Sequence, residues 1–223
     1  MNERDARAEI CRVGKSLFDR GYVHGTAGNV SVRLDDDSGY LITPTDACLG
    51  FLEASRIARV DGRLQQVSGD RASKTLLVHS RIYAAARAFD GGTSCVIHTH
   101  SAHCVALTLR RPLAEELLAP ITPYFVMKVG HVPLIPYGRP GAPQVAEAIA
   151  EAIRRYGGRG SPIRAVMLAR LGPNVWHDSP ASAMAVLEEL EETARLALSS
   201  PVDPEPLDEP RIDELRRAFG ARW

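Results

Sequence analysis

A short apolar segment that ends in two histidines constrains the fold of this chain more than any other feature. Val96 and Ile97 lead directly into His98 and His100, which are separated by one residue. Side chains two residues apart project from the same face of an extended strand. The sequence therefore predicts an apolar strand at whose end the two imidazoles reach the same point in space.

Two imidazoles that converge at a strand end are how a protein begins a divalent-metal site. Zinc or a similar ion needs a third protein ligand, which the pair His98 and His100 does not supply. The alternative is a surface strand with two unrelated histidines, because a bare His-x-His motif has a high false-positive rate. The rest of the chain has to distinguish these two interpretations.

The composition limits the class of protein. The 223 residues suit one large domain or two small ones, and a hydrophobic content of 45% provides a core. Because the chain has no net charge, we expect no nucleic acid as a partner. It has no apolar run long enough to span a membrane, and its first residues lack the apolar core of a signal peptide. Scattered cysteines without a Cys-x-x-Cys pair indicate a reduced, cytoplasmic protein.

Hydrophobic periodicity and turn residues predict a mixture of helices and strands. Helices are expected over residues 3–20, 75–89, 143–156, 180–198 and 212–219, and after Ser101. Strands are expected in the second half of 22–33, at 40–43, in a hairpin at 59–64, at the histidine pair, and at 132–135 and 163–169. A turn at 35–39, an irregular stretch at 112–144 and a linker at 200–210 complete the chain. Neighbouring hairpins favour one α/β domain with a mainly antiparallel sheet covered by helices.

Polar and glycine-rich motifs follow one another along nearly the whole chain. They are Gly25-Thr26-Ala27-Gly28-Asn29-Val30-Ser31-Val32-Arg33, Ile42-Thr43-Pro44-Thr45, Ser68-Gly69-Asp70, Val96-Ile97-His98-Thr99-His100-Ser101, Thr122-Pro123-Tyr124, Val129-Gly130, Pro136-Tyr137 and Glu214-Leu215-Arg216-Arg217. This ordered set resembles the class II aldolase/adducin family, and within it most of all the branch of 3-oxo-tetronate 4-phosphate decarboxylases. Any one of these motifs alone would be a weak signal, whereas the ordered set is specific.

The resemblance implies a three-layer α/β/α domain over residues 1–199, with the linker and short helix of 200–223 packed on the same domain. It also implies a homotetramer with active sites at subunit contacts and a small anionic substrate. In the family a divalent metal, usually zinc, acts as a Lewis acid on a sugar-phosphate-like substrate whose carbon–carbon bond breaks.

The residues themselves and the resemblance together give expected roles for several side chains. His98 and His100 would hold the metal. Tyr124 would donate a proton across a subunit contact, or pack in that interface. Lys74 would bind a substrate carboxylate and take part in catalysis, or cap a loop. The residues expected to bind substrate are Gly28, Asn29, Thr43, Thr45, Ser73 and Lys74.

Three positions depart from the family pattern. Thr75 stands where the family has an acid/base glutamate, and a threonine hydroxyl cannot exchange protons usefully near neutral pH. Leu171 stands where the family's Asn-His-Gly-Pro turn has its third metal histidine, and leucine cannot bind a metal. Asp46 follows Thr45 where the phosphate loop has a small residue, so its charge disfavours a phosphorylated substrate unless Lys74 or an arginine compensates.

Two histidines are candidates to replace the missing ligand. His177 lies six residues after Leu171 and would fold back towards the pair. His103 is a weaker candidate, because a residue at the start of a helix points to a different face from the strand pair.

Three functions are consistent with these residues. The first is a metal-dependent carbon–carbon lyase, a decarboxylase or aldolase, that acts on a small oxo- or hydroxy-acid. The second is a repurposed enzyme with an altered metal site and an unphosphorylated substrate. The third is a non-catalytic binding or scaffold protein that has lost the groups replaced by Thr75 and Leu171.

Overall fold

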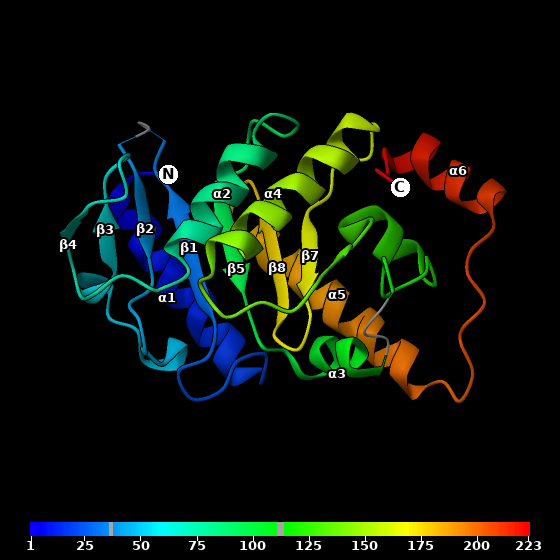
Figure 1. Ribbon diagram of the computed structural model, residues 1–223, viewed down its shortest axis with the longest axis horizontal. Helices are drawn as coiled ribbons and strands as arrows, with labels where there is room; N and C mark the ends of the chain where they lie inside the picture. Colours follow the sequence, from blue (N-terminus) through cyan, green and yellow to red (C-terminus); the bar gives the residue numbers. More distant parts are fainter. Residues whose placement is uncertain (36–37, 111–113) are drawn as a thin grey trace.

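Eight strands form one sheet in the part of the chain that the computed structural model describes, which is residues 1–35, 38–110 and 114–223 (Figure 1). Their order across the sheet is β4-β3-β2-β1-β5-β8-β7-β6. Every neighbouring pair is antiparallel except β6 and β7, which are parallel. The strands are β1 Asn29–Arg33, β2 Tyr40–Ile42, β3 Ala58–Val60, β4 Gln66–Ser68, β5 Cys95–His98, β6 Leu134–Ile135, β7 Ala165–Leu168 and β8 Gly172–His177.

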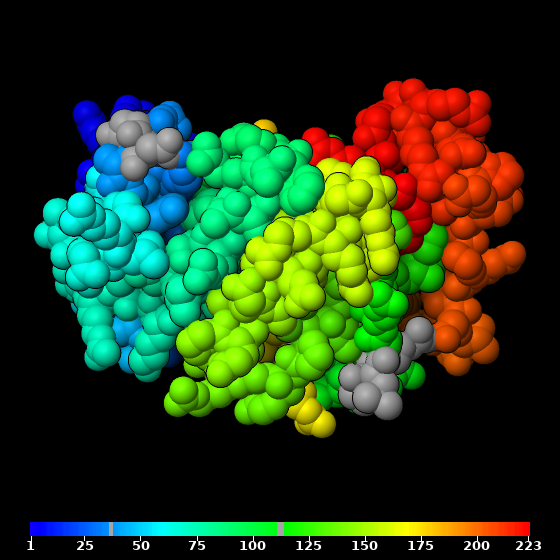
Figure 2. Space-filling model, turned by 45° about the horizontal axis from the view of Figure 1, so that its top comes forward, coloured from blue at the N-terminus to red at the C-terminus, as the bar shows by residue number. Residues whose placement is uncertain are grey.

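Helices cover both faces of this sheet and complete three layers (Figure 1). The helices are α1 Glu3–Asp19, α2 Leu76–Ala86, α3 Ala102–Arg110, α4 Pro143–Gly158, α5 Pro180–Ser199 and α6 Glu209–Phe219. One core cluster joins α1, α3 and α5 to the sheet, and a second joins α2 and α4 to its opposite face. Figure 2 shows α2 and α4 side by side over that second face. The expected three-layer α/β/α fold with a mainly antiparallel sheet is confirmed.

The helices begin and end close to where periodicity predicts them. In α1 the apolar residues Ala6, Ile10, Val13 and Leu17 are fully buried, and the Asn2 side chain caps the first turn by accepting from the Asp5 amide. The described residues hold no helix that combines the length and the apolar character needed to cross a membrane. The predicted turn at 35–39 and the irregular stretch at 112–144 lie partly outside the described residues.

The strand β8 is absent from the sequence prediction, although it lies near the centre of the sheet between β5 and β7. Its first two residues, Gly172 and Pro173, indicate a turn, and proline rarely enters a central strand because it has no N–H to donate. Here the Pro173 carbonyl accepts hydrogen bonds from the amide of Thr99 and from His98. This strand decides the geometry of the site.

A buried carboxylate fixes the helix that follows the histidine strand. Glu191 of α5 accepts hydrogen bonds from the backbone amides of His103 and Cys104 at 2.9 and 3.0 Å, and from His103 Nδ1 at 2.8 Å. The carboxylate thereby satisfies amides that the first turn of α3 leaves without partners. His103 is thus held by a carboxylate at the start of α3.

The C-terminal residues fold back onto the domain. Trp223 stacks on His131 with ring centroids 4.2 Å apart and lies edge-on to Phe125 at 5.7 Å. Phe125 begins a short π-helix, Phe125–Val129, within the stretch predicted to be irregular. Arg216 of α6 donates a hydrogen bond to the Trp223 carbonyl at 2.8 Å.

Candidate active site

A cavity of about 220 Å³ opens beside the end of β5. It lies on the sheet face that α2 and α4 cover, next to the loops that precede α2 and α4. The predicted site residues that line it are Gly28, Asn29, Thr45, Ser73, Lys74, Thr75, His98 and His100. The folded chain therefore brings most of the predicted site residues together at one place.

The two histidines lie next to one another, and burial favours their neutral forms. Their ring centroids lie 5.0 Å apart, with the rings at 68° to one another. His98 Nδ1 donates a hydrogen bond to the Pro173 carbonyl at 2.9 Å, which leaves Nε2 as the nitrogen without a proton. Burial, with a smaller effect of His100, lowers the pKa of His98 to about 4. Burial and the nearby His24 also lower the pKa of His100.

A glycine allows the chain to pass close to His98. Gly28 has a φ of 83°, in the left-handed region that favours glycine. A Cβ atom at this position would lie 3.0 Å from the His98 carbonyl oxygen and 2.6 Å from Val23 Cγ1. The predicted glycine-rich loop is thus tightly packed under the cavity.

Two asparagines lie on either side of His98 on the same face of the sheet. Asn29 of β1 is paired with His98 in the antiparallel register, and Asn174 of β8 is paired with it from the other side. Both asparagines line the cavity. Sequence reasoning missed Asn174 because it lies in the strand that was not predicted, and no local motif marks it.

A cation that was not predicted also lines the cavity. Arg139 belongs to the loop between β6 and α4, and it is exposed at the rim of the cavity, as is Lys74 of the loop before α2. Both side chains suit an anionic ligand. Arg139 lies in a Pro/Gly-rich segment with no periodic pattern, so the sequence alone offered no reason to select it.

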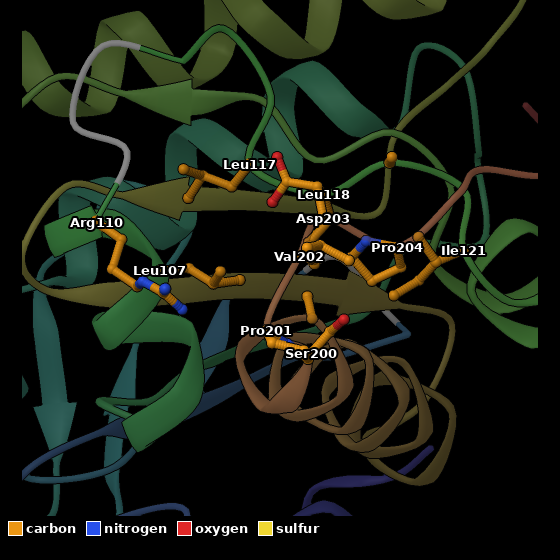
Figure 3. A pocket seen from close by; sticks show the side chains of 12 residues that line it. Leu107, Arg110, Leu117, Leu118, Ile121, Ser200, Pro201, Val202, Asp203 and Pro204 are labelled. Atoms are coloured by element: carbon orange, nitrogen blue, oxygen red, sulfur yellow. The ribbon is translucent and has the colours of Figure 1, made fainter.

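A second cavity, of about 280 Å³, lies at the far ends of α3 and α5 (Figure 3). Leu107 and Arg110 of α3 face Leu117, Val202 and other residues of the loop and linker. Among the residues that the structure describes, no histidine and none of the predicted site residues lines it. The cavity beside β5 is therefore the candidate active site.

The sequence matches the class II aldolase and adducin N-terminal domain over residues 8–198. The chain belongs to the class II aldolase and adducin family. A 3-oxo-tetronate 4-phosphate decarboxylase of Cupriavidus necator is 48% identical over 99% of both chains. One from Escherichia coli K12 is 38% identical over 87% of this chain and 86% of that protein. Among solved structures, YgbL of Escherichia coli, described as a putative aldolase/epimerase/decarboxylase, superposes with a TM-score of 0.85 at 37% identity and covers 96% of this chain and 99% of its own.

Asp46, one of the three departures, and Arg170, the residue before the departure at Leu171, occupy special backbone positions. Asp46 has a φ of 57° and Arg170 a φ of 65°, both in the left-handed region where the family motifs have a small residue and an asparagine. Lys74 Nζ lies 3.9 Å from Asp46 Oδ2 and offsets its charge. We expect an anionic substrate beside Asp46 only if Lys74 or an arginine compensates its charge, and Lys74 does so in part.

The side chains around His98 and His100 decide whether this chain can hold the metal predicted from the family. Leu171 lines the cavity together with His98 and His100. Within residues 1–35, 38–110 and 114–223, no three His, Cys, Asp or Glu side chains come together as a metal site would require. A catalytic zinc site uses three protein ligands. The residues of this chain therefore do not fit the family's metal site.

The prediction that His177 replaces the missing ligand is wrong. His177 pairs with Cys95 at the opposite end of β5 from His98. Because side chains alternate along a strand, it also lies on the other face of the sheet. Its Nδ1 lies 2.8 Å from Asp178 Oδ1. A substitute ligand that folds back from this position is geometrically impossible while β8 is a strand.

The remaining predicted site residues have different surroundings. Thr43 is fully buried, lies outside the lining of the cavity, and its hydroxyl accepts from the Val30 amide at 3.2 Å, so it holds two strands instead of a substrate. Ser73 Oγ lies 3.0 Å from Thr75 Oγ1 at the start of α2. Tyr124 is 62% exposed and lies outside the cavity lining, and its action across a subunit contact stays a prediction.

Proposed function

We propose that the protein is a carbon–carbon lyase that decarboxylates a small 3-oxo acid. The relatives named as 3-oxo-tetronate 4-phosphate decarboxylases support this reaction, because they match the chain over most of its length. The observation that carries the proposal is the cavity itself, whose floor is neutral and polar around His98 and whose rim carries Lys74 and Arg139. Such a cavity suits an anionic substrate whose charged groups bind at the rim and whose carbonyl group reaches the floor.

The charges at the rim fit the anionic groups of the substrate. Lys74 and Arg139 would hold the carboxylate and a second anionic group, because both are exposed cations on the lining of one cavity. Asp46 reduces the positive charge near Lys74. We therefore expect the second anionic group, a phosphate in the substrate named for the relatives, to depend more on Arg139 than on Lys74.

The buried floor would receive the reacting carbonyl. Loss of CO2 from a 3-oxo acid leaves an enolate, whose oxygen needs hydrogen-bond donors in a site from which water is excluded. Thr75 can position a substrate oxygen but cannot act as a general acid near neutral pH. A bound divalent metal would supply Lewis-acid chemistry, but the donor set is incomplete, so no step of this proposal passes through a metal.

The test is protein-dependent release of CO2 from 3-oxo-tetronate 4-phosphate and from its unphosphorylated counterpart, after subtraction of the spontaneous rate. We expect CO2 release above the spontaneous rate with the wild type. Arg139→Ala is expected to raise KM about tenfold, whereas Lys128→Ala, an exposed lysine outside the cavity, serves as the matched control. No release above the spontaneous rate from either substrate would refute the proposed function.

A second candidate function is anion binding without turnover. The specific observation in its favour is that Thr75 and Leu171 both line the cavity at positions where the family motifs have catalytic groups. Calorimetry with a four-carbon 3-hydroxy acid phosphate, beside the CO2 assay, separates the two functions. Binding with no CO2 release would favour the second candidate.

A further inference from the structure

The floor of the cavity is a row of three polar side chains from three adjacent strands. The register of β1, β5 and β8 aligns Asn29, His98 and Asn174 across the sheet. Directly paired residues of antiparallel strands project to the same side. All three side chains therefore face the cavity, and all three line it.

Each of the two amides in this row has one buried atom without a hydrogen-bond partner among the described residues. Asn174 is 2% exposed, and its buried Nδ2 has no hydrogen-bond partner among the described residues. Asn29 is 6% exposed, and its Oδ1 is likewise buried and unpaired within the described part of the chain. A buried polar atom without a partner costs about 1–3 kcal/mol. A fold that retains two such atoms beside one cavity has a site prepared for a polar ligand.

We propose that Asn174 is a catalytic residue, whose Nδ2 donates a hydrogen bond to the ketone oxygen of the substrate. This inference rests on the proposed decarboxylation. In that step the bond between the carboxylate carbon and C2 breaks, and its electron pair forms the double bond between C2 and C3. The carbonyl π electrons move onto the oxygen beside Asn174, CO2 leaves, and water later returns a proton to C2. The donor stabilises the oxygen most when it carries the negative charge.

The neighbouring groups are less suited to this role. Leu171 has no polar atom, and the Thr75 hydroxyl already lies 3.0 Å from Ser73 Oγ. Lys74 is exposed at the rim and lies near Asp46. Asn174 combines burial, a free donor and a place beside His98. The Asn29 oxygen would accept from a hydroxyl of the substrate, which fixes the direction in which the ketone enters.

The test compares Asn174→Ala and Asn174→Val with the wild type in CO2 release, thermal unfolding, and calorimetric binding of a four-carbon 3-hydroxy acid, which has no ketone. We expect kcat to fall about 100- to 1000-fold. Binding of the hydroxy acid should change less than threefold. The melting temperature of Asn174→Val should equal or exceed that of the wild type, because the variant removes a buried donor that has no partner.

The matched control is Val175→Ala, the next residue of β8, which is fully buried on the opposite face of the sheet. It should lower the melting temperature and leave kcat unchanged. An active wild type with Asn174 variants of similar kcat would overturn the inference alone. So would Asn174 variants whose loss of kcat follows a loss of stability like that of Val175→Ala. A wild type without CO2 release would overturn the proposed decarboxylation, and this inference with it.

Discussion

Two groups of buried polar side chains in this protein differ in one respect. The Glu191 carboxylate has three hydrogen bonds within the protein, from two backbone amides and from His103. The amides of Asn29 and Asn174 leave buried atoms without partners in the described structure. Glu191 is thus satisfied by the fold alone, whereas the row beside His98 is incomplete until a ligand binds. The difference separates groups that stabilise the protein from groups that we assign to its chemistry.

The largest expected effect comes from adding a metal ligand beside the row of Asn29, His98 and Asn174. Leu171→His would place an imidazole on the lining of the cavity that already holds His98 and His100. Residues that only hydrogen-bond to metal ligands change metal affinity about 10- to 100-fold. A third direct ligand should have a larger effect and raise the affinity for zinc at least about 100-fold. Calorimetric titration of metal-free protein with Zn²⁺ measures the change.

The double variant Leu171→His/His98→Ala is the control, and it should lose the gained affinity. The wild type, purified without a metal-binding tag, should contain well below one metal per chain by elemental analysis. One tightly held metal per wild-type chain would show that another group completes the shell. The side chains beside His98 would then not be incomplete in the way that distinguishes them from the fully hydrogen-bonded Glu191.

The second prediction concerns the fully hydrogen-bonded Glu191. Glu191→Ala removes a buried acceptor and leaves the amides of His103 and Cys104 without a partner at the start of α3. We expect the free energy of unfolding to fall by about 2–3 kcal/mol. Urea denaturation followed by circular dichroism gives this value.

Glu192→Ala provides the comparison from the next position of the same helix. Glu192 is exposed and accepts from Arg195 on the surface, so its removal should cost less than about 0.5 kcal/mol. Equal losses for Glu191→Ala and Glu192→Ala would show that the buried network contributes nothing beyond a surface pair.

Features that depend on local sequence could be predicted, whereas features that depend on the pairing of distant strands could not. The apolar spacing of Ala6, Ile10, Val13 and Leu17 predicted α1, and the His-x-His spacing predicted that His98 and His100 would meet. The position of Asn174 could not be predicted in this way. It depends on the pairing of β5 with β8, two strands separated by more than 70 residues, and the Gly-Pro start of β8 has the local signature of a turn.

The same reason explains the wrong assignment of His177. Its position six residues after Leu171 suggested that it would fold back to the histidine pair. A turn would have permitted that, but a strand carries each residue about 3.3 Å further along and alternates its side chains. The groups that matter most for chemistry therefore depend on tertiary pairing, whereas the scaffold around them depends on local periodicity.

His79 is intermediate between Glu191, which is fully hydrogen-bonded, and the asparagines beside His98, because only one of its two ring nitrogens has a partner. The third prediction, and the smallest expected effect, concerns this residue. Its Nδ1 lies 2.7 Å from Ser31 Oγ, which also contacts the Tyr83 hydroxyl at 2.8 Å, whereas its buried Nε2 has no partner in the described residues. Burial, with a smaller effect of His98, lowers the pKa of His79 to about 3 from an ordinary value of 6.5. The folded protein therefore keeps this ring neutral where the unfolded chain binds a proton. Stability is fully present above pH 6.5 and falls as the pH decreases towards 3.

Between pH 6.5 and pH 5 this single group should cost about 2 kcal/mol of unfolding free energy. Urea denaturation at the two pH values measures the loss, and His79→Gln, which does not titrate, should reduce it by about that amount. Val175→Ala, which removes no titratable group, is the control and should leave the loss between the two pH values unchanged. If His79→Gln and the wild type lose the same free energy, the ring is not held neutral by burial. Water would then reach Nε2, and His79 would not be a buried polar group without a partner.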